Sequence, residues 1–318
     1  MDRRAFLTVA GALWSTLGWP QAKKVRIGIL SPFAKTILEP SIVARLGELG
    51  YRSGQTAVIE ARSADGVAGH YAQLARELLD AQCDLLFASG HLATRALHAS
   101  GTKVPVVFMA LDFDPVAAGM VERLGRPGRN MTGVYAPAEA LVAKRLEIAM
   151  EVLPAARRFL VLTDPQTDDQ LSALGKVTKT RGVEIFNHRF AQPPFDLASA
   201  FAAGRHSRVD ALIGFTSPLW STNRAALARL IAEYRLPAFT TTTLRDEPGV
   251  LVAFGNDVAK LGRRVAELGV EILKGASPGA IPVQSLDEYE LVVNLRTAKM
   301  LGIKVPYSVL ARATKVIE

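Results

Sequence analysis

Short apolar runs alternate with amphipathic stretches along most of the chain, and this alternation is the feature that most limits how it can fold. The runs "VRIGILSP", "DLLFASG" and "VPVVFMALDF" are rich in branched and aromatic residues, as expected of strands that are covered on both faces. The stretches "HYAQLARELLDAQ" and "LATRALHAS" lie near them and have the period of a helix. This order of strands and helices predicts a parallel sheet with helices packed on its faces.

The alternation restarts near the middle of the chain. After the strand-like "MTGVYAP", the helical "ALVAKRLEIAMEVLP" opens a second series with the strand-like runs "FLVLTDP", "VEIFNHRF", "ALIGFTSP" and "PAFTTTT". Two such units of about 110 residues each predict two doubly wound lobes. No linker rich in Pro, Gly or Ser separates them, so we expect strands to join the lobes near Tyr135 to Pro137 and again at "VLVAFGND". More than one connection gives a hinge that suits closure on a ligand.

The first residues have the pattern of an export signal. Arg3 and Arg4 form a basic start, an apolar stretch runs from Ala5 to Trp19, and Pro20 and Ala22 follow. We expect residues 1–22 to be this signal, with cleavage after Ala22 and a periplasmic product. The run "DRRAFL" resembles a twin-arginine signal, and the general secretory route is the alternative. No cysteine follows the apolar stretch, which argues against a lipoprotein anchor, and a buried first helix is the remaining alternative.

The charge and hydropathy patterns favour a folded soluble protein. The formal net charge is +8, but Lys and Arg are scattered along the predicted helices, with no dense run and no interleaved aromatics. This pattern does not predict a nucleic-acid partner. No segment approaches the roughly 18 uninterrupted apolar residues of a membrane-spanning helix.

Signatures of catalysis and of cofactor binding are missing. The sequence contains neither the Gly-x-Gly-x-x-Gly dinucleotide fingerprint nor a phosphate loop ending in Gly-Lys-Ser/Thr. His91 and His98 are seven residues apart, about two helical turns, which is too far for a shared metal ion. Cys83 is the only cysteine, so no internal disulfide can form, and we expect a buried, inert thiol. We therefore predict a protein without catalysis, cofactor or metal.

Polar and aromatic residues cluster where the predicted strands end. The carboxyl ends of parallel strands meet at one edge of a sheet, which is where open α/β sheets bind ligands. We expect a ligand site from the residues at these ends and at the connections between the lobes: Ser31, Phe33, Ser89, Gly90, His91, Asp112, Tyr135, Asp164, Thr216, Trp220, Thr241 and Asp257.

The polar members of this set suggest a zwitterionic or carboxylate ligand. Ser31, Ser89 and Gly90 combine small side chains with helix starts, whose free N–H groups attract an anion. Asp112 or Asp164 could hold a cationic group by a charge-assisted hydrogen bond. Each of these side chains could instead be a helix cap.

The aromatic members and two further aspartates complete the prediction. Phe33, Tyr135 and Trp220 are expected to bound the pocket for the ligand's side chain. Asp257 is either a cap of the long helix that follows or a contact at the hinge. Asp114 precedes Pro115, and "PVAAGMV" predicts a short helix there, so Asp114 is expected to be its cap while Asp112 faces the cleft.

Several longer segments resemble one protein family. "IGILSP", "LGELGYRSGQTAVIEARSADG", "RPGRNMTGV" and "PVQSLDEYELVVNLRTAKMLGIKVP" are similar to the ABC-transporter substrate-binding family that includes tryptophan-type periplasmic binding proteins. The resemblance covers nearly all of the chain after the signal. It implies the type I periplasmic-binding-protein fold, with two α/β lobes, three connecting segments and the ligand in the cleft between them. It also implies capture of a small solute in the periplasm and delivery to an ATP-driven permease of the inner membrane.

The sequence departs from the family pattern at pocket positions. Phe113 stands where the family has a glycine before Asp-Pro-Val, and His91 stands where a small residue is common. Thr163, Asp164 and Pro165 replace the usual Asn-Pro turn. The ligand of a relative therefore does not transfer directly to this chain.

Together these observations predict an α/β protein of two doubly wound, Rossmann-like lobes. Lobe 1 is expected to comprise residues 23–137 plus about 256–281, and lobe 2 residues 138–255 plus about 282–318. The predicted function is that of a monomeric, periplasmic solute-binding component of an ABC importer.

Two alternatives to this function remain open. A periplasmic sensor that reports its ligand to a receptor would have the same pocket and a different partner. A racemase or lyase on a similar frame would need acid and base groups from both lobes, and His91 opposite Asp164 is the pair that the sequence offers.

Overall fold

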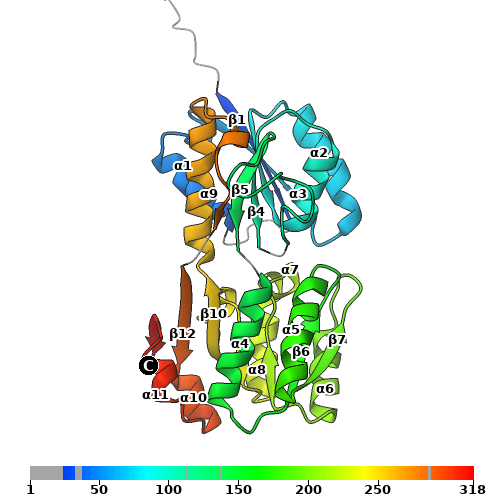
Figure 1. The fold of residues 1–318 in the computed structure, drawn as a ribbon, viewed down its shortest axis with the longest axis vertical. Helices are drawn as coiled ribbons and strands as arrows, with labels where there is room; N and C mark the ends of the chain where they lie inside the picture. Colours follow the sequence, from blue (N-terminus) through cyan, green and yellow to red (C-terminus); the bar gives the residue numbers. More distant parts are fainter. Residues whose placement is uncertain (1–23, 33–37, 112, 137, 286–287) are drawn as a thin grey trace, which may run out of the picture.

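The computed structural model describes residues 24–32, 38–111, 113–136, 138–285 and 288–318. They form two lobes that lie one above the other along the long axis of the molecule (Figure 1). The export signal predicted for residues 1–22 lies outside the described residues.

Lobe 1 is built on a six-stranded parallel sheet with the order β11-β5-β4-β3-β1-β2. Its strands are β1 (Val25–Ser31), β2 (Ala57–Ser63), β3 (Leu85–Ser89), β4 (Val106–Ala110), β5 (Met131–Tyr135) and β11 (Gln284–Ser285). Its helices are α1 (Leu38–Glu48), α2 (Tyr71–Asp80), α3 (Gly90–Ala99), α9 (Val258–Leu273) and the short 3-10 turns η1 (Ala68–His70) and η3 (Pro278–Ala280).

Both faces of this sheet are covered, as its apolar strands predict. Ile27 and Ile29 of β1 pack into a cluster with α1 and α9, whereas Leu30 packs into a second cluster with α2 and α3. Phe87 of β3 likewise belongs to the first cluster, and Phe108 of β4 belongs to the second. Successive side chains of a strand point to opposite faces, so nearly continuous apolar runs are needed when helices lie on both sides.

Lobe 2 is built on a seven-stranded sheet with the order β13-β12-β10-β9-β8-β6-β7. Its strands are β6 (Arg158–Thr163), β7 (Glu184–Arg189), β8 (Ala211–Ile213), β9 (Ala238–Thr240), β10 (Val250–Asn256), β12 (Tyr289–Asn294) and β13 (Lys315–Ile317). β6 to β10 pair in parallel, and β12 pairs antiparallel with β10. The helices are α4 (Ala138–Val152), α5 (Asp168–Arg181), α6 (Leu197–His206), α7 (Pro218–Thr222), α8 (Arg224–Glu233), α10 (Leu295–Leu301), α11 (Tyr307–Leu310) and the 3-10 turn η2 (Thr242–Leu244).

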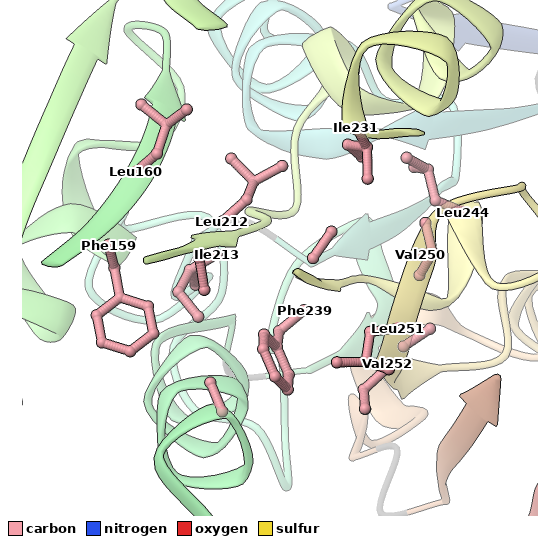
Figure 2. Close-up of a cluster of buried hydrophobic side chains, with 14 of the residues drawn as sticks. Phe159, Leu160, Leu212, Ile213, Ile231, Phe239, Leu244, Val250, Leu251 and Val252 are labelled. Atoms are coloured by element: carbon pink, nitrogen blue, oxygen red, sulfur yellow. The ribbon is translucent and has the colours of Figure 1, made fainter. Parts of the chain in front are cut away.

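One continuous hydrophobic core holds lobe 2 together. Phe159, Ile213, Phe239 and Val252 lie on neighbouring strands of the sheet, and helices such as α4 and α8 cover them. Figure 2 shows these side chains gathered between the strands and the helices. The two-lobed α/β architecture predicted from the sequence is thus confirmed.

The chain passes between the two sheets at three places. It passes from β5 to α4, from β10 to α9, and from β11 to β12. The third passage lies a few residues later than the sequence suggested, because Gln284 and Ser285 still pair with β5 in lobe 1. The short helix α7 was not predicted, because its five residues follow a strand without an apolar period of their own.

Helix α9 approaches the lobe 1 sheet closely at Gly269. A Cβ atom added there would lie 2.6 Å from Phe87 Cζ and 2.9 Å from Leu85 Cδ2, whereas one added at Gly175, within α5, would meet nothing within 4 Å. Gly269→Ala should therefore lower the free energy of unfolding by about 1–3 kcal/mol through overpacking.

Gly175→Ala is the matched control for this prediction. It should raise the free energy of unfolding by about 0.5–1 kcal/mol, because alanine loses less conformational entropy than glycine in a helix. Urea unfolding of both variants measures the difference. Equal effects would mean that α9 does not pack as closely as the structure indicates.

Candidate functional site: the junction between the lobes

The carboxyl ends of the parallel strands of both lobes lead to the junction between them. A small cavity of about 30 Å³ there is lined by Leu111 after β4, by Val258 and Leu261 of α9, and by residues of lobe 2 that include Leu141 and Thr216. Residues that lie far apart in the sequence therefore share one concave surface, and this surface is the candidate ligand site.

On the lobe 1 side, the turn from β3 into α3 presents Ser89 and Gly90. Gly90 has φ +79°, a conformation that favours glycine, and its carbonyl accepts a hydrogen bond from Thr94 Oγ1. The Ser89 side chain makes no capping hydrogen bond to α3. Ser31 is buried at the end of β1, and its carbonyl accepts the Ala64 N–H. This edge offers small polar groups beside a helix start.

His91, the next residue of α3, stacks on Phe113. The two ring centroids are 4.9 Å apart and the rings are inclined by 21°. Burial lowers the pKa of His91, the nearby Arg95 lowers it further, and Asp169 on α5 of lobe 2 opposes these effects. A carboxylate of lobe 2 thus contributes to the electrostatic environment of this lobe 1 ring.

The residues around Phe113 only partly match the sequence prediction. Asp114 Oδ1 accepts hydrogen bonds from the N–H groups of Val116 and Ala117, so Asp114 is a cap, as expected. The segment that follows is a turn and not the predicted short helix. Asp112 and Phe33 lie outside the described residues, and their roles stay predictions.

On the lobe 2 side, Asp164 follows β6 and is only 4% exposed. Its Oδ1 accepts the Gln166 N–H, and Thr167 Oγ1 bonds to the Asp164 backbone. Burial raises the pKa of Asp164, against the lowering effects of the Gln166 N–H and of Ser217. The buried Ser217 hydroxyl lies close to Asp164 but makes no well-formed hydrogen bond within the described chain. Asp164 is thus a buried carboxyl group that forms no ion pair among the described residues, although the charge of Arg189 also lowers its pKa.

Thr216, after β8, is held in place by two buried side chains. Gln170 of α5 accepts the Thr216 N–H at 2.9 Å and donates to its carbonyl at 2.8 Å. Arg145 of α4 donates to Thr216 Oγ1 at 3.3 Å. The backbone of Thr216 is therefore fixed, and its hydroxyl is polarised by a cation.

Arg145 was missed in the sequence-based prediction. It is 1% exposed, and its guanidinium also donates to the carbonyls of Gly214 and Phe254. Burial lowers its pKa to about 9, so it stays charged near neutral pH. The signal was present in the sequence, because Arg145 has the helical spacing of the buried Val142 and Leu146 in an otherwise apolar face.

The remaining predicted residues lie at different depths. Trp220 is 1% exposed and packs in the core of lobe 2. Its indole N–H donates a hydrogen bond to the Leu162 carbonyl. In this conformation Trp220 therefore presents no surface to a ligand. Thr241 lines the junction cavity, and Tyr135 ends β5 just before the first passage. Asp257 caps α9 by accepting the N–H groups of Ala259 and Lys260.

The described residues contain neither a candidate membrane span nor a cluster of metal ligands. No described helix is both long and apolar enough to span a membrane. Within the described part of the chain, no three His, Cys, Asp or Glu side chains gather as a metal site. Cys83 is buried, as predicted, and burial raises the pKa of its thiol to about 11.

The lowered pKa of His91 gives a pH-dependent prediction. Because the pKa of His91 is below its ordinary 6.5 in the folded state, the unfolded chain takes up this proton at a higher pH than the folded chain. The contribution of His91 to the free energy of unfolding is therefore complete above pH 6.5 and is lost as the pH falls through the lowered pKa. We expect the stability advantage of the wild type over His91→Gln to shrink between about pH 8 and pH 5. Urea unfolding of both proteins at several pH values measures it. An advantage independent of pH would contradict the buried position of the ring.

Comparison with known proteins places the chain in a family. The model of the family described as ABC transporter substrate binding protein matches residues 36–317. A solved conserved domain protein of Vibrio cholerae has a TM-score of 0.82 and 25% identity, covering 92% of this chain and 100% of that one.

Two further relatives have named ligands. The ABC domain from Streptococcus pneumoniae in complex with L-Trp has a TM-score of 0.78 and 26% identity, covering 92% of this chain and 100% of that one. A tyrosine-binding protein of Clostridioides difficile is 25% identical over 266 residues, which are 82% of this chain and 75% of the relative. The resemblance noted in the sequence is confirmed: the chain belongs to the ABC transporter substrate-binding protein family, a family of non-enzymatic transport components, and has the type I periplasmic-binding-protein fold.

Proposed function

We propose that this chain is the exported solute-binding component of an ABC importer and that it binds an amino acid in the cleft at the junction of its lobes. The observation that carries the proposal is a cavity lined by residues of both lobes, among them Leu111 after β4 and Thr216 after β8, in a fold whose lobes are joined by three connecting segments. Closure about these segments would enclose the ligand and present it to a permease of the inner membrane.

The polar groups of the junction suit the two charges of an amino acid. Asp164 is buried and its pKa is raised, so an ammonium group that approaches it would stabilise the ionised form. The Ser89–Gly90 turn and the Thr216 and Thr241 hydroxyls offer hydrogen bonds to a carboxylate. Relatives that are described as bound to L-Trp and as tyrosine-binding support an amino acid as the ligand class.

The lobe 1 side suits an aromatic or apolar side chain. The partly exposed His91 ring stacks on the buried Phe113 directly after the Ser89–Gly90 turn, and Tyr135 stands at the adjoining passage. Aromatic rings stack favourably on one another. We therefore infer that the ligand's side chain contacts lobe 1.

Thermal unfolding in the presence of a solute panel tests the proposal. The panel contains L-tryptophan, L-tyrosine, L-leucine, L-glutamate and small aromatic acids. A solute at a hundred times its dissociation constant should add about 2.7 kcal/mol to the stability. The proposal fails if no solute of the panel raises the melting temperature.

Asp164→Asn is the matched variant for this experiment. Asparagine can still accept the Gln166 N–H through its carbonyl oxygen, so the turn should fold. Affinity for amino acids should fall about tenfold or more, since a hydrogen bond to a charged group is worth about 1.5–3 kcal/mol. Analogues that lack the amino group should bind the wild type and Asp164→Asn equally. If Asp164→Asn lowered the affinity for these analogues as much as the affinity for amino acids, the assigned role of Asp164 would be contradicted.

Uptake separates the importer from a sensor with the same pocket. A strain that lacks this protein should take up the bound solute more slowly, and the wild-type gene should restore uptake. Unchanged uptake, together with solute binding in vitro, would favour a sensor.

A further inference from the structure

Arg145 is a buried cation without an acidic partner among the described residues. Its three hydrogen-bond acceptors are the neutral Phe254 carbonyl at 3.0 Å, the Gly214 carbonyl at 2.6 Å and Thr216 Oγ1 at 3.3 Å. The ion pairs of the described chain do not include it. A buried charge is costly unless an opposite charge compensates it. The resting structure therefore holds a positive charge that a bound anion would stabilise.

The guanidinium also has hydrogen-bonding capacity to spare. Nε, Nη1 and Nη2 each make one hydrogen bond within the described chain, whereas a guanidinium carries five N–H groups. One N–H on Nη1 and one on Nη2 remain for another acceptor.

Thr216 adds a hydrogen-bond donor beside this guanidinium. Its Oγ1 accepts from Arg145, and its own hydroxyl proton has no acceptor among the described residues. The residue is partly exposed, and Gln170 fixes its backbone from both sides. A hydroxyl that accepts from a cation becomes a stronger donor to an anion. Thr216 can therefore donate to a ligand while it is polarised by Arg145.

The cavity beside these groups has the lining of an anion site. Arg145 is the single charged residue among the described residues that line it. The others are apolar residues and small polar ones, among them Thr216, Thr241 and Thr243. Both lobes contribute to the lining, since Leu111 and Leu261 belong to lobe 1. A cation and hydroxyls without a carboxylate match the chemistry of a carboxylate-binding pocket.

We propose that Arg145 and Thr216 together bind the carboxylate of the solute and make the protein selective for solutes that carry one. This inference rests on the proposed function, because it assumes that the junction holds the solute. It assigns the carboxylate to lobe 2 and not to the Ser89–Gly90 turn of lobe 1, where the sequence alone had suggested it.

The position of Asp164 agrees with this assignment. β6 and β8 are paired neighbours with Val161 opposite Ile213, and Asp164 and Thr216 each lie three residues beyond these partners. The two charged groups of an amino acid are attached to one carbon atom. A carboxylate at Thr216 therefore brings the ammonium group close to the strand end that carries Asp164.

Calorimetric titration with acid and amide pairs tests the inference. The pairs are L-tryptophan with L-tryptophanamide and L-tyrosine with L-tyrosinamide, because the amides replace the carboxylate by a neutral group of similar size, and the titration is done at about pH 6 so that the amino group stays charged in both. The wild type should bind the better acid at least tenfold more tightly than its amide. Thr216→Val should reduce this preference at least tenfold and Thr216→Ser should restore it, while Thr180→Val, at an exposed position of α5 outside the cavity, should leave it unchanged. Ser89→Ala tests the alternative that the turn of lobe 1 holds the carboxylate.

A second variant guards against a purely structural role of Arg145. Arg145→Gln should abolish the preference between acid and amide, and its melting temperature without ligand reports whether it folds. If it does not fold, the comparison of Thr216→Val with Thr216→Ser decides alone.

Failure of the inference differs from failure of the proposed function. A wild type that binds acids and amides equally, or a folded Thr216→Val that keeps the full preference, would overturn the role of Arg145 and Thr216 alone. Loss of the preference in Ser89→Ala and not in Thr216→Val would return the carboxylate to lobe 1. No binding of any panel solute would overturn the proposed function, and this inference with it.

Discussion

Parallel pairing of the strands is the constraint on which the rest of this structure depends. All six strands of lobe 1, and β6 to β10 of lobe 2, run in parallel within their sheets. Every loop that follows such a strand therefore leaves its sheet at the same edge. Three passages of the chain join the two lobes, which lie one above the other (Figure 1), and Leu111 of lobe 1 lines one cavity together with Thr216 and Thr241 of lobe 2.

The two lobes bring different chemistry to this junction. Lobe 2 buries two groups of opposite charge, Arg145 and Asp164, each held by neutral hydrogen bonds. Lobe 1 brings the stacked rings of His91 and Phe113 and the Ser89–Gly90 turn. Buried charges are destabilising in the empty protein, and a zwitterion between them would offset that cost. We infer that lobe 2 recognises the charged part of the solute and lobe 1 its side chain.

Arg145 also connects the segments about which the lobes would move. It lies in α4, which follows the first passage, and it donates to the Phe254 carbonyl of β10, which leads into the second passage. A carboxylate bound to this guanidinium would therefore contact the corner of lobe 2 from which two of the three passages leave. The same residue would therefore contact the ligand and connect the two segments that lead into the hinge.

Much of the fold followed from the sequence, because apolar period and strand–helix order decide it. The covered strands of lobe 1 read as continuous apolar runs, and the capping role of Asp114 followed from the proline after it. Side-chain direction at a strand end does not follow from such patterns. Trp220 looked like a cleft aromatic, but α7 turns it into the core.

Arg145 shows the opposite error. It looked like one more surface arginine, whereas its place in the apolar period of α4 buries it at the junction. The helix expected after Asp114 is a turn for a related reason, since a cap and a proline start a helix that tertiary packing need not continue. Local sequence signals thus predicted most of the helices and strands. The burial and the contacts of individual side chains could be determined only from the assembled lobes.

The most direct test is a crystal structure of the protein with the solute of the panel that raises its melting temperature most. We expect that solute at the junction, with contacts to the His91–Phe113 stack from one side and to Thr216 and Asp164 from the other. A solute bound to the outer surface of one lobe, with the junction empty, would contradict the central claim that the facing strand ends form the binding site.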